Sequence, residues 1–207
     1  MIHLIGGPPK CGKTTLAKRI ARDQGIPWVS TDTLQNVIKP YIPRADFDLK
    51  FPATTQRCDS NDEKFSKYSA EEIITAYRTQ ARTVAEAIDM FIVSEITDGN
   101  DFVIEGYHIE PAFAEEMVKK YPEHVTCVFL IKNDARKFVS DVQKSTTPND
   151  WIIARTQADE TYERIANMIV SYGRQVEHDA LELSFPVINM DEDFLNQIDV
   201  AASTLLK

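Results

Sequence analysis

The segment with the clearest chemistry is a short run near the start of the 207-residue chain. Residues 7–14 read Gly-Pro-Pro-Lys-Cys-Gly-Lys-Thr and match the phosphate-binding pattern G-x-x-x-x-G-K-[ST] at every fixed position. Gly7 and Gly12 allow the backbone to curl so that successive N–H groups point at phosphate oxygens. The pattern predicts that Lys13 reaches the β- and γ-phosphates of a nucleotide and that the Thr14 hydroxyl ligates Mg²⁺.

The segments on either side of this loop also favour a nucleotide site. Ile2–Ile5 predicts a short buried strand, and Lys13–Asp23 has the apolar spacing of an amphipathic helix. The N-terminus of such a helix attracts anions, because its free N–H groups and its dipole are positive. Three of the seven glycines fall here, which argues against a chance match. We therefore expect the nucleotide to contact Gly7, Pro8, Pro9, Lys10, Cys11, Gly12, Lys13, Thr14 and Thr15.

Carboxylates follow two other predicted strands, at the edge of a parallel sheet where ligands bind. Asp32 comes just after Pro27–Ser30, where it is expected to orient an acceptor hydroxyl and accept its proton. The alternative is that Asp32 caps a helix over residues 33–38. Glu105 follows Phe102–Ile104 and is expected to hold a Mg²⁺-bound water or the substrate.

Two further interpretations concern the segment around Glu105. The alternative for Glu105 is that it binds neither Mg²⁺ nor substrate and is only a turn residue before Gly106. His108 lies just beyond and either contacts the substrate or is a buried structural histidine.

Arginines and lysines supply the charge that phosphoryl transfer needs, because guanidinium groups stabilise the developing oxygen charge bidentately. Arg136 and Arg155 lie on either side of a polar segment and are the first candidates, with Lys137 and Lys144 as weaker ones. For Arg155, packing of the aliphatic stem is the alternative.

A second group of cations is expected on the substrate side. Arg78 and Arg82 are four residues apart and share a helix face, where they either clamp an anionic substrate or pair with Glu86 in solvent. Arg44, Arg57 and the lysines of residues 50–67 could also meet an anion, and nothing in the sequence selects among them.

Strands and helices alternate along the chain, which predicts an α/β fold with a parallel sheet covered by helices. Val125–Ile131 and Phe185–Asn189 are the fourth and fifth strands. Ser69 and Glu72 form a capping box that starts a long helix ending near residues 98–99. Further helices are expected from Trp151 to about Glu177 and over Glu192–Leu206.

The chain is expected to form one domain, residues 1–207, with two additions to the sheet. Residues 33–99 form a substrate-binding insertion and helix, in which Pro40–Lys67 has little periodicity and is expected to be irregular and mobile. Residues 133–150 are polar and are expected to form a lid.

Composition excludes several classes of protein. The net charge of −9 argues against a nucleic-acid partner. The apolar runs are too short for a membrane span, and no targeting segment is visible. Three widely spaced cysteines exclude a disulfide scaffold and give no zinc spacing, which fits a cytoplasmic protein. Cys11 is either a redox-sensitive thiol or a small filler, and we favour the filler. The oligomeric state cannot be read from the sequence.

The chain contains no Asn-Lys-x-Asp segment for reading guanine and no strand ending in Asp-Glu. It resembles the P-loop small-molecule kinases, a group that includes adenylate, shikimate, gluconate and zeta-toxin-like kinases. Residues 104–111, Ile-Glu-Gly-Tyr-His-Ile-Glu-Pro, look like a stretch of the 2-phosphoglycerate kinases, and Gln80–Ile92 is similar too. The resemblance implies a three-layer fold with a five-stranded sheet in the order 2-3-1-4-5. It also implies adenine binding by Asn189–Asp191, where the alternative is a turn with Asp191 as a helix cap.

The expected function is therefore that of an ATP-dependent kinase that uses Mg²⁺. It would phosphorylate a hydroxyl of a small, anionic metabolite, as a 2-phosphoglycerate kinase does. One alternative is a nucleoside or nucleotide kinase, with Trp28, Tyr41 and Phe47 available to stack on a base. The other is a nucleotide-binding regulatory or toxin-like module with little turnover.

Overall fold

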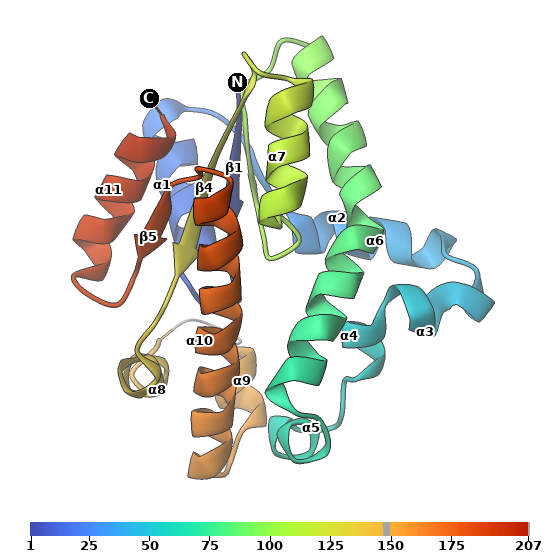
Figure 1. Ribbon diagram of the computed structural model, residues 1–207, viewed down its shortest axis with the longest axis vertical. Helices are drawn as coiled ribbons and strands as arrows, with labels where there is room; N and C mark the ends of the chain where they lie inside the picture. The colour runs from blue at the N-terminus through green and yellow to red at the C-terminus, as the bar shows by residue number, and fades with distance from the viewer. Residues whose placement is uncertain (147–149, 207) are drawn as a thin grey trace.

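A five-stranded sheet forms the centre of the computed structural model, which describes residues 1–146 and 150–206 (Figure 1). All of its strand pairs are parallel, and the strand order is β2-β3-β1-β4-β5. Both the sheet and its order confirm the expectation from the sequence. The strands are β1 (Ile2–Gly6), β2 (Trp28–Ser30), β3 (Phe102–Glu105), β4 (Val125–Ile131) and β5 (Val187–Asn189).

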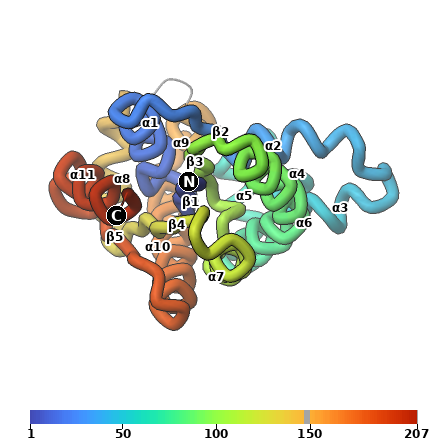
Figure 2. Tube along the Cα trace, turned by 90° about the horizontal axis from the view of Figure 1, so that it is seen from above, coloured from blue at the N-terminus to red at the C-terminus, as the bar shows by residue number. Residues whose placement is uncertain are grey.

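Helices cover both faces of this sheet and complete three layers (Figure 2). Helices α1 and α11 pack on one face, and α6, α7 and α10 pack on the other. The helical segments of the described residues are α1 (Lys13–Gln24), α2 (Thr31–Ile38), η1 (Lys39–Tyr41), η2 (Arg44–Asp46), α3 (Phe47–Lys50), α4 (Pro52–Thr55), α5 (Asn61–Lys67), α6 (Ala70–Thr97), α7 (Pro111–Lys120), α8 (Ala135–Gln143), α9 (Trp151–Arg155), α10 (Asp159–Glu182) and α11 (Phe194–Leu205).

The expectation that residues 40–67 lack regular structure is wrong. Five short helical segments follow one another there, and Phe51 and Phe65 from this stretch are buried in the core. Prolines lie in the first turn of two of the segments: Pro40 is the second residue of η1, and Pro52 is the first residue of α4. Proline is favoured in the first turn of a helix, because that position needs no N–H donor. Pro40 and Pro52, which we expected to interrupt regular structure, therefore lie where proline is compatible with a helix.

The capping box at Ser69 is confirmed. The Ser69 side chain accepts a hydrogen bond from Glu72 N, and the Glu72 carboxylate accepts one from Ser69 N. Helix α6 then runs for 28 residues and packs on the same face of the sheet as α7 and α10.

The single helix expected from Trp151 to about Glu177 is wrong in its first half. The structure breaks it into α9 and α10 and extends α10 to Glu182. A residue of α5 stabilises the break between α9 and α10, because the Asp62 carboxylate accepts hydrogen bonds from the N–H groups of Gln157 and Ala158. Asp62 thus caps backbone donors that the start of α10 leaves free.

The segment expected as a polar lid contains helix α8, which packs against α10. Phe138 and Val142 of α8 are buried, so this helix belongs to the packed body. Residues 147–149, the end of the expected lid, lie outside the described residues. In the described part of the chain, no helix has the length and apolar character that a membrane crossing requires.

Candidate functional site

The loop between β1 and α1 has the backbone conformation that its glycines predict. Gly7 has φ +122° and Gly12 has φ +92°, both in the region that favours glycine. A Cβ atom at Gly7 would lie 2.1 Å from the Leu130 carbonyl oxygen of β4. The loop therefore curls against the sheet and leaves the N-terminus of α1 open, as an anion site requires.

The side chains of the loop lie as follows. Lys13 is buried, and its Nζ donates to the Pro8 carbonyl oxygen at 2.5 Å. Lys10 forms an ion pair with the buried carboxylate of Asp150, across from the loop. Cys11 is fully buried, and burial raises the pKa of its thiol to about 11. A protonated, enclosed thiol supports the filler interpretation of Cys11.

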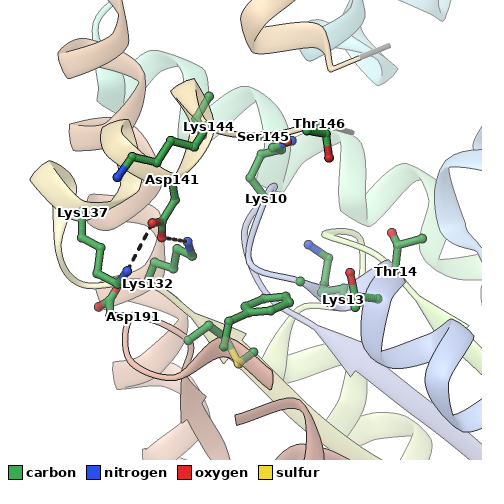
Figure 3. Close-up of a pocket in the computed structure, with 15 residues that line it drawn as sticks. Lys10, Lys13, Thr14, Lys132, Lys137, Asp141, Lys144, Ser145, Thr146 and Asp191 are labelled. Atoms are coloured by element: carbon green, nitrogen blue, oxygen red, sulfur yellow. Dashed lines mark hydrogen bonds and ion pairs between the residues drawn. The ribbon is translucent and has the colours of Figure 1, made fainter. Parts of the chain in front are cut away.

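A cavity of about 590 Å³ opens beside the loop, and we call it the loop cavity (Figure 3). Its cations are mainly lysines from the loop, from the end of β4 and from α8. Lys132 and Lys137 each place Nζ 3.2 Å from a carboxylate oxygen of Asp141. The lining residues are Lys10, Gly12, Lys13, Thr14, Thr15, Lys132, Lys137, Asp141, Val142, Lys144, Ser145, Thr146, Met190, Asp191 and Phe194.

The loop after β5 closes one side of the loop cavity. Asp191 Oδ2 accepts hydrogen bonds from Asn133 N at 2.7 Å and from Asp134 N at 3.1 Å. The interpretation of Asp191 as the cap of the last helix is wrong, because Asp193 is the N-cap of α11. Asp191 Oδ1 is buried and has no hydrogen-bond partner among the described residues. A buried acceptor without a donor costs free energy, and a ligand N–H would satisfy it.

A second cavity of about 290 Å³ adjoins the loop near the ends of β2 and β3, and we call it the Asp32 cavity. The parallel register places Glu105 opposite Ile5, one residue before the end of β1. Both strand-end carboxylates therefore meet at the loop, as predicted. The lining residues are Pro9, Lys10, Lys13, Thr14, Ser30, Asp32, Tyr77, Glu105, Gly106, Tyr107 and Trp151.

Glu105 is 3% exposed, and its Oε1 accepts a hydrogen bond from the Thr14 hydroxyl at 2.8 Å. Burial raises the pKa of Glu105, while the charge of Lys13 opposes the increase. The hydroxyl and the carboxylate are hard oxygen ligands of the kind that Mg²⁺ prefers. Among residues 1–146 and 150–206, no group of three or more His, Cys, Asp or Glu side chains is placed to hold a metal. The pair therefore suits a cation that takes its other ligands from phosphates and water, which fits Mg²⁺.

Asp32 lies in the first turn of α2 and does not cap it. Ser30 is the N-cap, and its Oγ accepts a hydrogen bond from Asp32 N at 3.2 Å. The capping alternative for Asp32 is therefore wrong. The Asp32 side chain is 62% exposed, and the cavity walls around it raise its pKa by desolvation. The charges of Lys13 and Lys39 oppose that increase.

The ring of His108 is 1% exposed and has both nitrogens engaged. Nε2 lies 2.8 Å from Gln35 Oε1, which only accepts hydrogen bonds, so the proton is on Nε2. Nδ1 then accepts from the Thr31 hydroxyl, also at 2.8 Å. Burial lowers the pKa of His108 to about 3, so the ring is neutral. This arrangement supports the structural interpretation of His108, which holds the start of α2 next to Asp32.

Gln80 was not among the expected site residues, yet it links the hydrogen bonds around His108 to Thr54 of the insertion. Gln80 Nε2 donates to the Tyr107 hydroxyl at 2.7 Å and also to Gln35 Oε1. Gln80 Oε1 accepts from Thr54 N at 3.1 Å. The available signal was a polar residue within the apolar stripe of the long helix, because buried polar groups there need partners.

The cations predicted for phosphoryl transfer lie in different places. Arg136 is exposed and lines neither cavity. Phe138 is buried, and Lys137, Asp141 and Lys144 follow the i, i+4, i+7 spacing of the α8 face at the loop cavity. The weaker candidates, Lys137 and Lys144, are therefore the ones at the cavity. Arg155 donates to the Cys58 carbonyl oxygen of the insertion.

Arg78 and Arg82 line a third cavity, of about 510 Å³, between α6, α7 and α10. Arg78 Nε lies 2.8 Å from Glu110 Oε2, and its Nη2 forms an ion pair with Asp179. Arg78 is paired with two carboxylates, and neither arginine lines the Asp32 cavity. The clamp of Arg78 and Arg82 on an anionic substrate stays a prediction.

Taken with the sheet order, the glycine loop and its following helix define the fold as that of the P-loop kinases. The shikimate kinase of Bacteroides thetaiotaomicron superposes with a TM-score of 0.51 at 15% identity, covering 98% of this chain and 94% of that one. No protein-family model matches the chain.

Two relatives agree with the resemblance to P-loop small-molecule kinases. The chain is 32% identical over 120 residues to the mevalonate-3-phosphate 5-kinase of Thermoplasma acidophilum, covering 58% of this chain and 56% of the relative. It is 31% identical over 114 residues to the 2-phosphoglycerate kinase of Pyrococcus furiosus, covering 55% and 37%. The chain thus aligns with about half of one relative and just over a third of the other. These similarities support a small-molecule kinase.

Proposed function

We propose that this protein transfers the γ-phosphoryl group of ATP to a hydroxyl of a small, anionic metabolite. The observation that carries the proposal is that Lys13, Thr14 and Glu105 lie at the phosphate loop while Asp32 lies in the same cavity as all three. Nucleotide-holding and acceptor-activating groups thus share one space. The relatives named as kinases of phosphorylated hydroxy acids support an acceptor of that kind.

Each residue has a chemical part in this proposal. The loop N–H groups and Lys13, with Lys132, Lys137 and Lys144, bind the phosphates by charge. Thr14 and Glu105 would hold Mg²⁺, which would neutralise phosphate charge when bound. Lysines replace the arginines that we expected at this position.

Asp32 orients the acceptor hydroxyl and accepts its proton. The acceptor oxygen forms its bond to the γ-phosphorus while the bond to the bridging oxygen of ATP breaks, which leaves ADP.

The nucleoside-kinase alternative has less support from the residues first considered for it. Tyr41 is 83% exposed, the Phe47 ring packs 5.3 Å from Phe51, and Trp28 lies beneath Lys18. None of the three lines the Asp32 cavity.

The experiment is a screen for acceptor-dependent ADP release with ATP and Mg²⁺. The panel holds glycerate, 2-phosphoglycerate, mevalonate, mevalonate 3-phosphate, sugar acids and nucleosides. We expect release only with hydroxy acids or their phosphates. Release with nucleosides alone would favour the alternative kinase. Nucleotide binding without stimulation by any acceptor would overturn the kinase proposal and point to a regulatory module.

A further inference from the structure

Four cations on segments near the Asp32 cavity interact electrostatically in pairs without lining the cavity, and we call them the cationic cluster: Lys39, Arg57, Lys64 and Arg155. Lys64 Nζ lies 5.4 Å from the ring centroid of Tyr77, which lines the cavity. Arg155 ends α9, the short helix whose first residue, Trp151, lines the same cavity. Lys64 and Arg155 therefore lie beside two residues, Tyr77 and Trp151, that form the wall of the cavity that holds Asp32.

The elements that carry the cluster are fixed to each other. Arg155 Nη2 donates to the Cys58 carbonyl oxygen, next to Arg57 in the chain. Asn61 Nδ2 of α5 donates to the Trp151 carbonyl oxygen of α9 at 3.0 Å. Helix α5, which carries Lys64, is thus docked on α9, which carries Arg155, so both charges are held in place before any ligand arrives.

In the part of the chain that the structure describes, the four charges of the cluster have no carboxylate at ion-pair distance. Burial lowers the pKa of Lys64 to about 8, and the like charge of Arg155 adds to the effect. The pKa of Lys39 is also lowered by burial, with Arg57 adding to the effect and Asp32 opposing it.

Like charges held together without counterions are unfavourable, and an anionic ligand reverses that cost. The loop cavity has its own lysines for the nucleotide, Lys13, Lys132, Lys137 and Lys144. None of the four cations of the cluster lines the loop cavity, whereas Lys64 and Arg155 lie next to Tyr77 and on the helix of Trp151, which line the Asp32 cavity. We therefore assign the cluster to the acceptor. A phosphate monoester offers three strong acceptor oxygens to such a mixed lysine and arginine set.

We propose that Lys64 and Arg155, with Lys39 and Arg57 beside them, bind a phosphate group carried by the acceptor, whose free hydroxyl lies at Asp32. The acceptor class is then a hydroxy acid monophosphate. This proposal rests on the proposed kinase function, and it gives Arg155 a role in acceptor binding in place of the transfer role expected from the sequence.

The test compares two variants of neighbouring lysines on α5. Lys64→Met removes the charge at the cavity, and Lys67→Met removes an exposed charge from the same helix as the matched control. Direct binding is measured by calorimetry without ATP, with 2-phosphoglycerate against glycerate and with mevalonate 3-phosphate against mevalonate. Lys64→Arg tests rescue, and melting curves confirm that each variant is folded.

We expect wild type to bind one phosphorylated compound at least tenfold more tightly than its unphosphorylated partner. Lys64→Met should weaken that binding by about 10- to 100-fold, the range for losing a charged hydrogen bond. Lys67→Met should stay within about twofold of wild type, and Lys64→Arg should recover most of the affinity. In steady state, the KM for the acceptor should rise while the KM for ATP stays the same.

Binding without a preference for the phosphorylated compounds, no binding of any of them, or a preference that survives Lys64→Met would overturn this proposal. The proposed kinase function fails separately, if no acceptor stimulates ADP release. Turnover with unphosphorylated acceptors that is insensitive to Lys64→Met would leave the kinase standing and remove the phosphate subsite.

Discussion

At the scale of single residues, the site depends on a few side chains whose burial sets their protonation. Asp32 and Glu105 share a cavity with Lys13, and desolvation raises the pKa of both carboxyls. The pKa of His108 is lowered, because burial disfavours the charged form of the ring. The same physical cause thus makes Asp32 a better proton acceptor and keeps His108 neutral.

Asp32→Asn should lower kcat by about 10²-fold or more while sparing ATP affinity, because it removes the proton acceptor and little else. In wild type, kcat/KM should fall as the pH drops through the raised pKa of Asp32, since only the charged carboxylate accepts a proton. The variant should lack that acidic limb. The measurement is a pH–rate profile, with Asp48→Asn, on exposed α3, as the control. Near-normal turnover in Asp32→Asn would remove Asp32 from the mechanism.

His108 should also make folding stability depend on pH. Its pKa is about 3 in the folded protein against an ordinary 6.5, so the unfolded chain binds the proton first as the pH falls. The contribution of neutral His108 to the free energy of unfolding is fully present above about pH 6.5, and it is lost as the pH falls from about 6.5 to about 3. The slope from this residue is at most about 1.4 kcal/mol per pH unit.

Denaturant titrations of wild type and His108→Gln between pH 4.5 and pH 7.5, values chosen to span about half of that window, measure this linkage. The carboxyls of Asp32, Glu105 and Glu110 have pKa values raised by desolvation and act with the opposite sign, but they are present in both proteins. The variant should therefore lose less stability toward acid than wild type. Equal slopes in the two proteins would contradict the buried, neutral ring.

At the scale of elements, the short helices α5 and α9 carry Lys64 and Arg155 of the cationic cluster. The break between α9 and α10 lets Trp151 line the Asp32 cavity and turns Arg155 toward Cys58. A continuous helix would have spread these residues along one straight face. The break depends on Asp62, because that carboxylate binds the two N–H groups that the interruption frees.

Asp62→Ala should therefore lower the free energy of unfolding by about 1 kcal/mol, as loss of a helix cap does. Denaturant unfolding measures it, with Asp59→Ala in the same exposed stretch as the control. The KM for the acceptor should rise as well, because α9 and Arg155 lose their anchor. Unchanged stability would show that the break is maintained by other contacts.

At the scale of the whole molecule, an acidic chain places a group of its positive charges around the candidate site. The net charge is −9, yet five lysines line the loop cavity, and the cationic cluster adds two lysines and two arginines near the Asp32 cavity. Clefts of one sign focus the electrostatic potential and attract oppositely charged ligands. The loop cavity and the Asp32 cavity are both lined by residues at or just after the carboxyl ends of the parallel strands.

Binding of ATP with Mg²⁺ should raise the melting temperature of the whole protein. A ligand at 100 times its Kd stabilises the folded state by about 2.7 kcal/mol, which corresponds to about 5–10 °C for a chain of this size. Lys13→Ala should abolish the shift while its melting temperature without ligand stays near that of wild type. Lys18→Ala, exposed on the same helix, is the control. No shift in wild type would remove the basis of the nucleotide site.

Much of the fold follows from local patterns that the sequence carries by itself. Glycine spacing, the strand and helix periodicities and the Ser69 capping box depend on residues within a few positions of each other. They correctly predicted the loop, the five strands and the meeting of Asp32 with Glu105 at one edge. The prolines of residues 40–67 misled, because proline starts a helix as readily as it ends one.

Only the tertiary structure decided which charges face which ligand. Arg155 meets Cys58 across 97 residues of sequence, and Lys64 meets the Tyr77 ring through the packing of two separate helices. Arg136 and Lys137 are neighbours in sequence, yet the burial of Phe138 turns one to solvent and the other to the cavity. Local patterns determine the elements, but the packing of apolar faces sets their rotation, and that rotation selects the side chains that reach a site.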